Sequence, residues 1–72
     1  SGDDDNWYYS FEYYENIYKT KNGNVYVFNM DDLKWEISNV TYSDLNYFAN
    51  YDKVNKNDVI EIIQKYSSFK EV

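Results

Sequence analysis

The dipeptide Asn22-Gly23 constrains this chain most, because it lies between two stretches in which apolar and polar residues alternate. Asn and Gly tolerate the positive φ angles of a type I′ turn, which joins two antiparallel strands through a two-residue loop. A loop of this length fixes the register, so Thr20 is expected to pair with Val25 and, further out, Tyr18 with Val27. The sequence therefore predicts a β-hairpin with one defined register.

A second tight turn is expected at Asp31-Asp32, where it pairs Phe28 with Trp35. Both turns place the same apolar residues on one face of the sheet, which we interpret as the core. That face is expected to carry Ile17, Tyr26, Phe28, Met30, Leu33, Trp35 and Ile37. The opposite, outer face is expected to carry Tyr18, Thr20, Val25, Val27, Asn29, Lys34, Glu36 and Ser38.

The aromatic segment from residue 6 to residue 15 is predicted to form another strand on the same core face. Aromatic residues occupy its odd-numbered positions, and Ile17 also has an odd number, so a continuous strand places them all on one face. Crowded aromatic side chains favour a strand over a helix. A helix capped by Asp5 is the alternative, and a break or bulge is expected near Glu15. The residues in question are Trp7, Tyr9, Phe11 and Tyr13.

Two helices are expected after Val40. A short one follows Thr41 or Ser43, either of which can act as its N-cap. A longer amphipathic helix is predicted to begin at Asn57, with acidic residues in its first turn. Its apolar face is expected to carry Val59, Ile62, Ile63 and Tyr66.

These elements predict an α+β fold, a small antiparallel β-meander of three to four strands with a C-terminal α-helix packed on one face. A chain of 72 residues is large enough for only one such domain, which we expect to span residues 6–72. Residues 1–5 are expected to form a disordered acidic tail, in which Ser1-Gly2 has the character of a cloning remnant.

The inventory of side chains argues against catalysis. The chain contains no His, no Cys and no Arg, so the commonest general base, the thiol nucleophile and the bidentate anion clamp are all missing. The acidic pairs and triplets, such as Asp31-Asp32, lack the alternating ligands and the glycine of a calcium loop. We therefore expect no enzymatic activity, no cofactor and no metal site.

The charge of the chain bears on its partners. Thirteen acidic residues against seven basic ones give a formal net charge of −6, and the lysines are scattered singly, so direct nucleic-acid binding is not expected. No apolar run is long enough for membrane insertion. An acidic surface attracts a protein partner with a basic surface. The compartment is left undecided, with a slight preference for an extracytoplasmic one.

The ten tyrosines suggest a function, because they are too many for one small core. Rings left outside the core predict a binding patch, although they can also pack with one another on the back of the sheet. We predict a non-catalytic protein-binding or accessory module. A carbohydrate or cell-wall binding module and a structural homo-oligomer such as a homodimer are the alternatives. The predicted partner-binding residues are Tyr8, Glu12, Tyr14, Tyr18 and Glu36.

Overall fold

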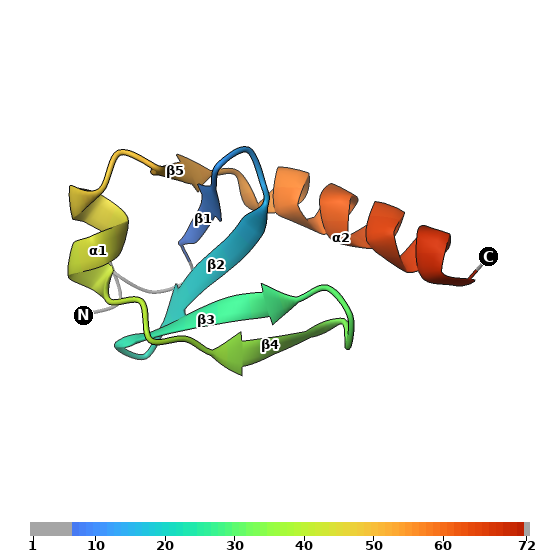
Figure 1. The fold of residues 1–72 in the computed structure, drawn as a ribbon, viewed down its shortest axis with the longest axis horizontal. Coiled ribbons are helices and arrows are strands. Elements are labelled where there is room, and N and C mark those ends of the chain that lie inside the picture. The colour runs from blue at the N-terminus through green and yellow to red at the C-terminus, as the bar shows by residue number, and fades with distance from the viewer. Residues whose placement is uncertain (1–6, 72) are drawn as a thin grey trace.

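The computed structural model describes the backbone of residues 7–71 and the side chains of residues 7–65, so the predicted tail at residues 1–5 lies outside the described part. Five strands and two helices follow one another along this part of the chain (Figure 1). They are β1 (Tyr8–Phe11), β2 (Asn16–Lys21), β3 (Asn24–Asn29), β4 (Lys34–Ile37), α1 (Tyr42–Tyr47), β5 (Tyr51–Val54) and α2 (Lys56–Glu71).

The strands form one antiparallel sheet in the order β4-β3-β2-β1-β5. The predicted α+β class with an antiparallel meander and a C-terminal helix is confirmed, but the sheet has five strands rather than three to four. The additional strand is β5, which reaches the sheet after the chain passes from β4 at one edge through α1 to the other edge. Its sequence, Tyr-Asp-Lys-Val, is too short and too polar to indicate a strand on its own.

The predicted register of the central hairpins is confirmed. Tyr18 pairs with Val27, and the turn residues Asn22 and Gly23 have φ angles of 52° and 79°. Phe28 pairs with Trp35 across the next turn, as the sequence also predicted. The turn chemistry is local, which explains why these pairings could be predicted.

The segment before these hairpins forms a strand, as predicted, but its parity is the reverse of the predicted one. Tyr9 pairs with Tyr18, and Ser10 pairs with Ile17. The reason is the four-residue turn between β1 and β2, which places odd-numbered residues of β1 opposite even-numbered residues of β2. Tyr9 therefore lies on the face of Tyr18, and Tyr8 lies on the face of Ile17.

The prediction of a single core face is wrong, because both faces of the sheet are covered. Leu45 of α1 packs on one face, where the side chains of Thr20 and Val25 are buried rather than outward-facing. Val59 of α2 packs on the other face against Ile17. The first cluster contains Tyr9, Tyr18, Val25 and Leu45, and the second contains Ile17, Phe28 and Val59.

Several residues assigned to the core are exposed instead. Tyr13 lies in the β1–β2 turn with 95% of its surface exposed, and Ile37 at the end of edge strand β4 is 68% exposed. Leu33 in the β3–β4 turn is also exposed. All three lie in turns or at a strand end, where no helix covers them.

The predicted helices are both present. Thr41 caps α1 through a capping box, in which its hydroxyl accepts from the Asp44 N–H and the Asp44 carboxylate accepts from the Thr41 N–H. The prediction of Asn57 as N-cap of α2 is wrong, because the helix begins at Lys56 and Asn55 accepts the Asn57 N–H at 2.7 Å.

Helix α2 contacts the sheet through its first half and then extends past the end of the sheet (Figure 1). The predicted apolar face is confirmed for Val59, Ile62 and Ile63, which join the second core cluster. The side chain of Tyr66 lies outside the described residues. Neither α2 nor α1, over the residues described, combines the length and the apolar composition that a membrane span requires.

Candidate functional site

The structure does not bring the five predicted partner-binding residues together. Tyr8 is half-buried on the α2 face, where its ring lies 6.1 Å from that of Trp35. Tyr14 is half-buried against the same cluster, and its pKa is raised by burial and, to a lesser degree, by the negative charge of Asp58. Both rings contribute mainly to packing around α2.

Tyr18 lies on the other face and is only 8% exposed. Its ring packs edge-on against Tyr51 of β5 at 5.6 Å. Burial raises the pKa of Tyr18, and the charge of Tyr51 and a hydrogen bond to Tyr51 raise it further. The expectation that Tyr18 faces outward is therefore wrong, because Leu45 of α1 packs on this face of the sheet and the Tyr51 ring packs against Tyr18.

The two predicted carboxylates lie on different elements. Glu36 is exposed on β4, where its carboxylate accepts a hydrogen bond from the Asn29 amide at 2.8 Å. Glu12 is exposed in the β1–β2 turn, where its carboxylate accepts from the Asn50 amide at 3.0 Å. That either residue contacts a partner stays a prediction. Glu12 borders a hollow of the surface.

The β1–β2 turn has an unusual backbone. Glu12, Tyr13 and Tyr14 have φ angles of 49°, 56° and 68°, so three consecutive residues other than glycine lie in the left-handed region. Each such residue costs about 1 kcal/mol or more, because its Cβ crowds the backbone. Hydrogen bonds of the turn hold this geometry, from the Glu15 N–H to the Glu12 carbonyl and from the Glu12 N–H to the Asn50 carbonyl.

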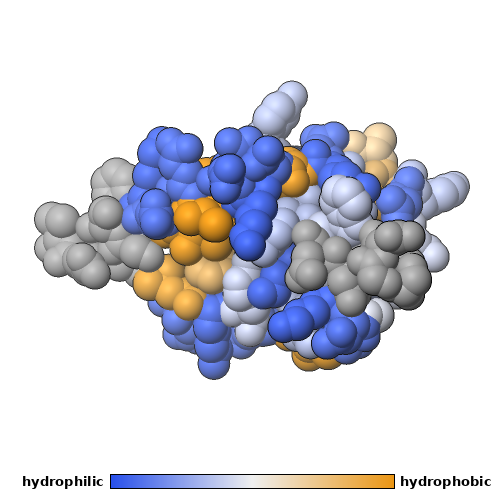
Figure 2. All heavy atoms as spheres, turned by 180° about the vertical axis from the view of Figure 1, so that it is seen from behind, coloured by the Kyte–Doolittle hydropathy of each residue, from blue (hydrophilic) through white to orange (hydrophobic). Residues whose placement is uncertain are grey.

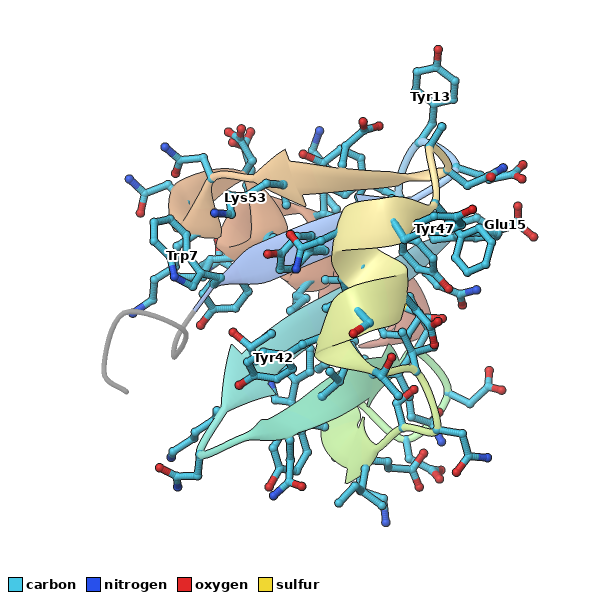
Figure 3. The ribbon with its side chains drawn as sticks, turned by 90° about the vertical axis from the view of Figure 1, so that its left-hand side faces the viewer. Trp7, Tyr13, Glu15, Tyr42, Tyr47 and Lys53 are labelled. Atoms are coloured by element: carbon cyan, nitrogen blue, oxygen red, sulfur yellow. The ribbon has the colours of Figure 1, made fainter. Side chains whose placement is uncertain are left out.

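A hollow of about 300 Å³ lies where this turn meets the loop between α1 and β5. Tyr13 stands at its rim and points away from the rest of the molecule (Figure 3). Asn50 lines the hollow and also anchors the turn, so the two segments form one continuous surface. The hollow is lined by Glu12, Tyr13, Ala49, Asn50 and Asp52.

Two aromatic side chains extend this surface beyond Ala49. The rings of Tyr47 and Phe48 lie 5.0 Å apart at an interplanar angle of 88°, and Tyr47 is 81% exposed. Tyr47 lies on the same side of the molecule as Tyr13 in Figure 3. We name this area the turn surface, and it comprises Glu12, Tyr13, Tyr47, Phe48, Ala49, Asn50 and Asp52.

The charge of the turn surface is negative. Glu12 and Asp52 both line the hollow, whereas none of the lysines in the described part of the chain does. Lys53 follows Asp52 directly, but its ammonium group lies 3.7 Å from the ring centre of Trp7. Figure 3 shows Lys53 beside Trp7, on the side opposite Tyr47.

Two other hollows differ from this one in charge. One, of about 380 Å³, lies between the β2–β3 turn and the β4–α1 connection and is lined by uncharged residues. The hydroxyl of Tyr42, in its lining, is buried and has no hydrogen-bond partner among the described residues. The other, of about 330 Å³, lies beside α2 and carries charges of both signs, on Asp58, Glu61 and Lys65.

Apolar side chains also reach the surface on the far side of the molecule, between hydrophilic ones (Figure 2). Leu33 of the β3–β4 turn and Ile60 of α2 are the large apolar residues exposed on these two elements. Both are less exposed than Tyr13 or Tyr47. The turn surface therefore remains the strongest candidate site.

Comparisons with protein families, with curated proteins and with solved structures found no match to this chain. Among the described side chains, those of residues 7–65, no three acidic, His or Cys side chains are placed so that they could share a metal ion. What the turn surface offers chemically is exposed rings, one amide and two carboxylates. These are groups for contact and hydrogen bonding.

Sequence reasoning identified Glu12 but missed the rest of the turn surface. Tyr13 was expected on the core face because continued alternation places it there. The pairing of Asn50 with Glu12 spans 38 positions, so no local pattern could have indicated it.

Proposed function

We propose that this protein is a non-catalytic protein-binding module and that the turn surface is its binding face. The observation that carries this proposal is Tyr13, which is 95% exposed on a turn with an energetically costly backbone. An exposed ring at this position adds little to folding. Tyrosine is enriched at the hot spots of protein interfaces, where a ring becomes buried and its hydroxyl stays hydrogen-bonded.

The neighbours of Tyr13 suit the same role. Phe48 and Tyr47 present apolar area whose burial by a partner is favourable, and Tyr47 brings a second hydroxyl. Asn50 and Glu12 are held in place by their mutual hydrogen bonds, so little conformational entropy is lost when a partner binds them. The surface is therefore preorganised for contact.

The arrangement of the rings supports a protein partner over a carbohydrate. Sugar rings stack on flat aromatic faces, and a sugar-binding groove calls for coplanar exposed rings. The rings of Tyr47 and Phe48 are nearly perpendicular, and one face of Trp7 is covered by Lys53. Perpendicular rings instead suit an irregular protein surface, into which each ring can insert separately.

The proposal is tested by affinity capture of a partner with the wild-type chain, followed by calorimetric titration of that purified partner. Phe48→Ser and Tyr47→Ser are expected to raise the Kd about tenfold. Ile37→Ser is the matched control, because Ile37 is also exposed and apolar but lies at the end of β4.

Equal Kd values for the wild type, Phe48→Ser and Tyr47→Ser would contradict the proposal. A large effect of Ile37→Ser alone would move the binding face to β4. Sedimentation velocity on the same proteins examines the homodimer alternative. A wild-type dimer that dissociates on Phe48→Ser substitution would make the turn surface a self-association surface instead.

A further inference from the structure

The two carboxylates of the turn surface come from distant parts of the chain. Glu12 lies in the turn after β1, and Asp52 lies in β5, which pairs with β1. Both border the same hollow, and both are exposed. Glu15, also exposed, adds a third negative charge in the same turn. A cation in the hollow would therefore meet negative charge from two sides.

Among the described residues, no lysine lines the hollow, so its negative charge has no positive side chain beside it in the lining. Lys53 is directed to Trp7 rather than to the hollow, and Lys19 lies over the ring of Trp35 at 4.5 Å. The Asn50 amide donates one hydrogen bond to Glu12, but a carboxylate has two oxygens and can accept several. Glu12 can therefore accept further hydrogen bonds from a partner.

The rings complete a site for a cationic side chain with an apolar neighbour. Tyr13 stands at the rim of the same hollow as Glu12, and its exposed ring is open to contact with a cation, which is a favourable interaction. Phe48 and Tyr47 lie next along the surface and offer contact to an apolar side chain. The two carboxylates and the Tyr13 ring thus border the hollow, and the paired rings of Tyr47 and Phe48 come from the segment that leads into it.

We infer that the turn surface binds a protein segment in which a lysine or arginine stands beside an apolar residue. The cation enters the hollow between Glu12 and Asp52 and contacts the Tyr13 ring, and the apolar side chain packs on Phe48. This inference rests on the proposed function and names the class of partner. The carboxylates supply specificity and a faster association rate.

The test is a selection of short random peptides displayed on phage, with the wild-type chain as bait. The library is first depleted on a Tyr13→Gly/Phe48→Ser double variant, whose fold is checked by circular dichroism. We expect the enriched peptides to contain Lys or Arg next to an apolar residue. Their affinity is expected to fall with added salt, because the attraction between exposed charges is screened.

A second pair of variants isolates the carboxylates. Glu12→Gln keeps the oxygen that accepts from Asn50, and Asp52→Asn is equally close in shape, so the fold is retained. Together they are expected to weaken the selected peptides about tenfold. Lys19→Ser is the control, because Lys19 lies over Trp35 and away from the hollow.

The outcomes separate the two proposals. Enriched peptides without Lys or Arg, unaffected by Glu12→Gln/Asp52→Asn but lost on the Tyr13→Gly/Phe48→Ser variant, overturn the partner class and leave the protein-binding role standing. Peptides that bind this depletion variant as well as the wild type overturn both proposals. Failure to enrich any peptide that distinguishes the two baits likewise counts against both.

Discussion

The side-chain amide of Asn50 donates a hydrogen bond to the Glu12 carboxylate at 3.0 Å, and the Glu12 N–H donates to the Asn50 carbonyl at 3.2 Å. This two-way contact ties the β1–β2 turn to the loop between α1 and β5. Together with the hydrogen bond from the Glu15 N–H to the Glu12 carbonyl, it holds a turn built from three left-handed residues in one conformation. The turn surface depends on this pair.

Replacing Asn50 by Ala should lower the free energy of unfolding by about 0.5–1 kcal/mol, because one exposed hydrogen bond is lost. Urea denaturation measures this difference. Asn39→Ala serves as the control, since Asn39 is exposed in the β4–α1 connection and its replacement should change stability by less than about 0.5 kcal/mol. Equal effects of both substitutions would show that the Asn50 side chain does not support the turn.

Replacing Tyr13 by Gly should raise the free energy of unfolding by about 1 kcal/mol, because glycine adopts a φ of 56° without steric cost. Tyr13→Ala should leave stability nearly unchanged, since its Cβ keeps the strain and the ring makes little contact. Chemical denaturation of the three proteins tests this order. A glycine variant less stable than the alanine variant would contradict the left-handed turn.

Replacing Val59 by Ala should lower the free energy of unfolding by about 2 kcal/mol, because this side chain of α2 is fully buried against the cluster that contains Ile17. Ile60→Ala is the matched comparison on the same helix. Ile60 is exposed, so its truncation should cost less than about 1 kcal/mol. Thermal unfolding that ranks the two variants the other way would place a different face of α2 against the sheet.

Stability should decline at alkaline pH, in part through Tyr18. Its pKa is raised above the ordinary 10.0 in the folded state, chiefly by burial. The folded state therefore holds this proton more tightly than the unfolded chain, and the contribution is complete below pH 10.0 and is lost as the pH rises through the raised pKa. Lys19 has the opposite effect on the pH dependence of stability: burial lowers its pKa from 10.5, so its contribution to stability increases as the pH rises.

Tyr18→Phe isolates the tyrosine from the lysine. The variant should be less stable than the wild type by about 1 kcal/mol near neutral pH, because it loses the hydrogen bond to Tyr51. This difference should stay constant below pH 10.0 and shrink only as the pH rises above it, since the ionising group is gone from the variant. Parallel pH profiles for the two proteins would refute the raised pKa.

The central part of the sheet could be predicted from sequence because its turn signals are local. Asn22-Gly23 fixed the pairing of β2 with β3, and the register continued through the Asp31-Asp32 turn into β4. The capping box at Thr41 is equally local, with its two partners only three positions apart. In each case the residues that decide the geometry are close neighbours in the chain.

The β1–β2 turn could not be predicted, because local preferences oppose its geometry. Tyr13 and Tyr14 are residue types that rarely adopt positive φ angles, and the contact that holds the turn comes from Asn50. Because of this turn, the residues of β1 lie on the opposite faces of the sheet from those that the sequence predicted. The strand β5 was missed for a related reason, since its pairing with β1 is a tertiary contact.

Only the chemical character of the candidate site could be predicted from the sequence, and not most of its residues. An excess of tyrosines and acidic residues indicated a binding surface of rings and carboxylates, and Glu12 was named as part of it. Tyr8, Tyr14 and Tyr18 were named as well, but Tyr18 lies in the core cluster on one face of the sheet and the other two lie in the cluster on the opposite face. The side chains that stay exposed are set by which strands and helices cover each face, and that depends on the whole topology.

The most direct test is calorimetric titration of the captured partner into the wild type and Tyr13→Gly, with the free energy of unfolding measured on the same samples. If Tyr13 serves binding at the expense of folding, the glycine variant will be more stable and its Kd will be about tenfold higher. A more stable variant that binds the partner with unchanged Kd would contradict the assignment of the turn surface as the binding face.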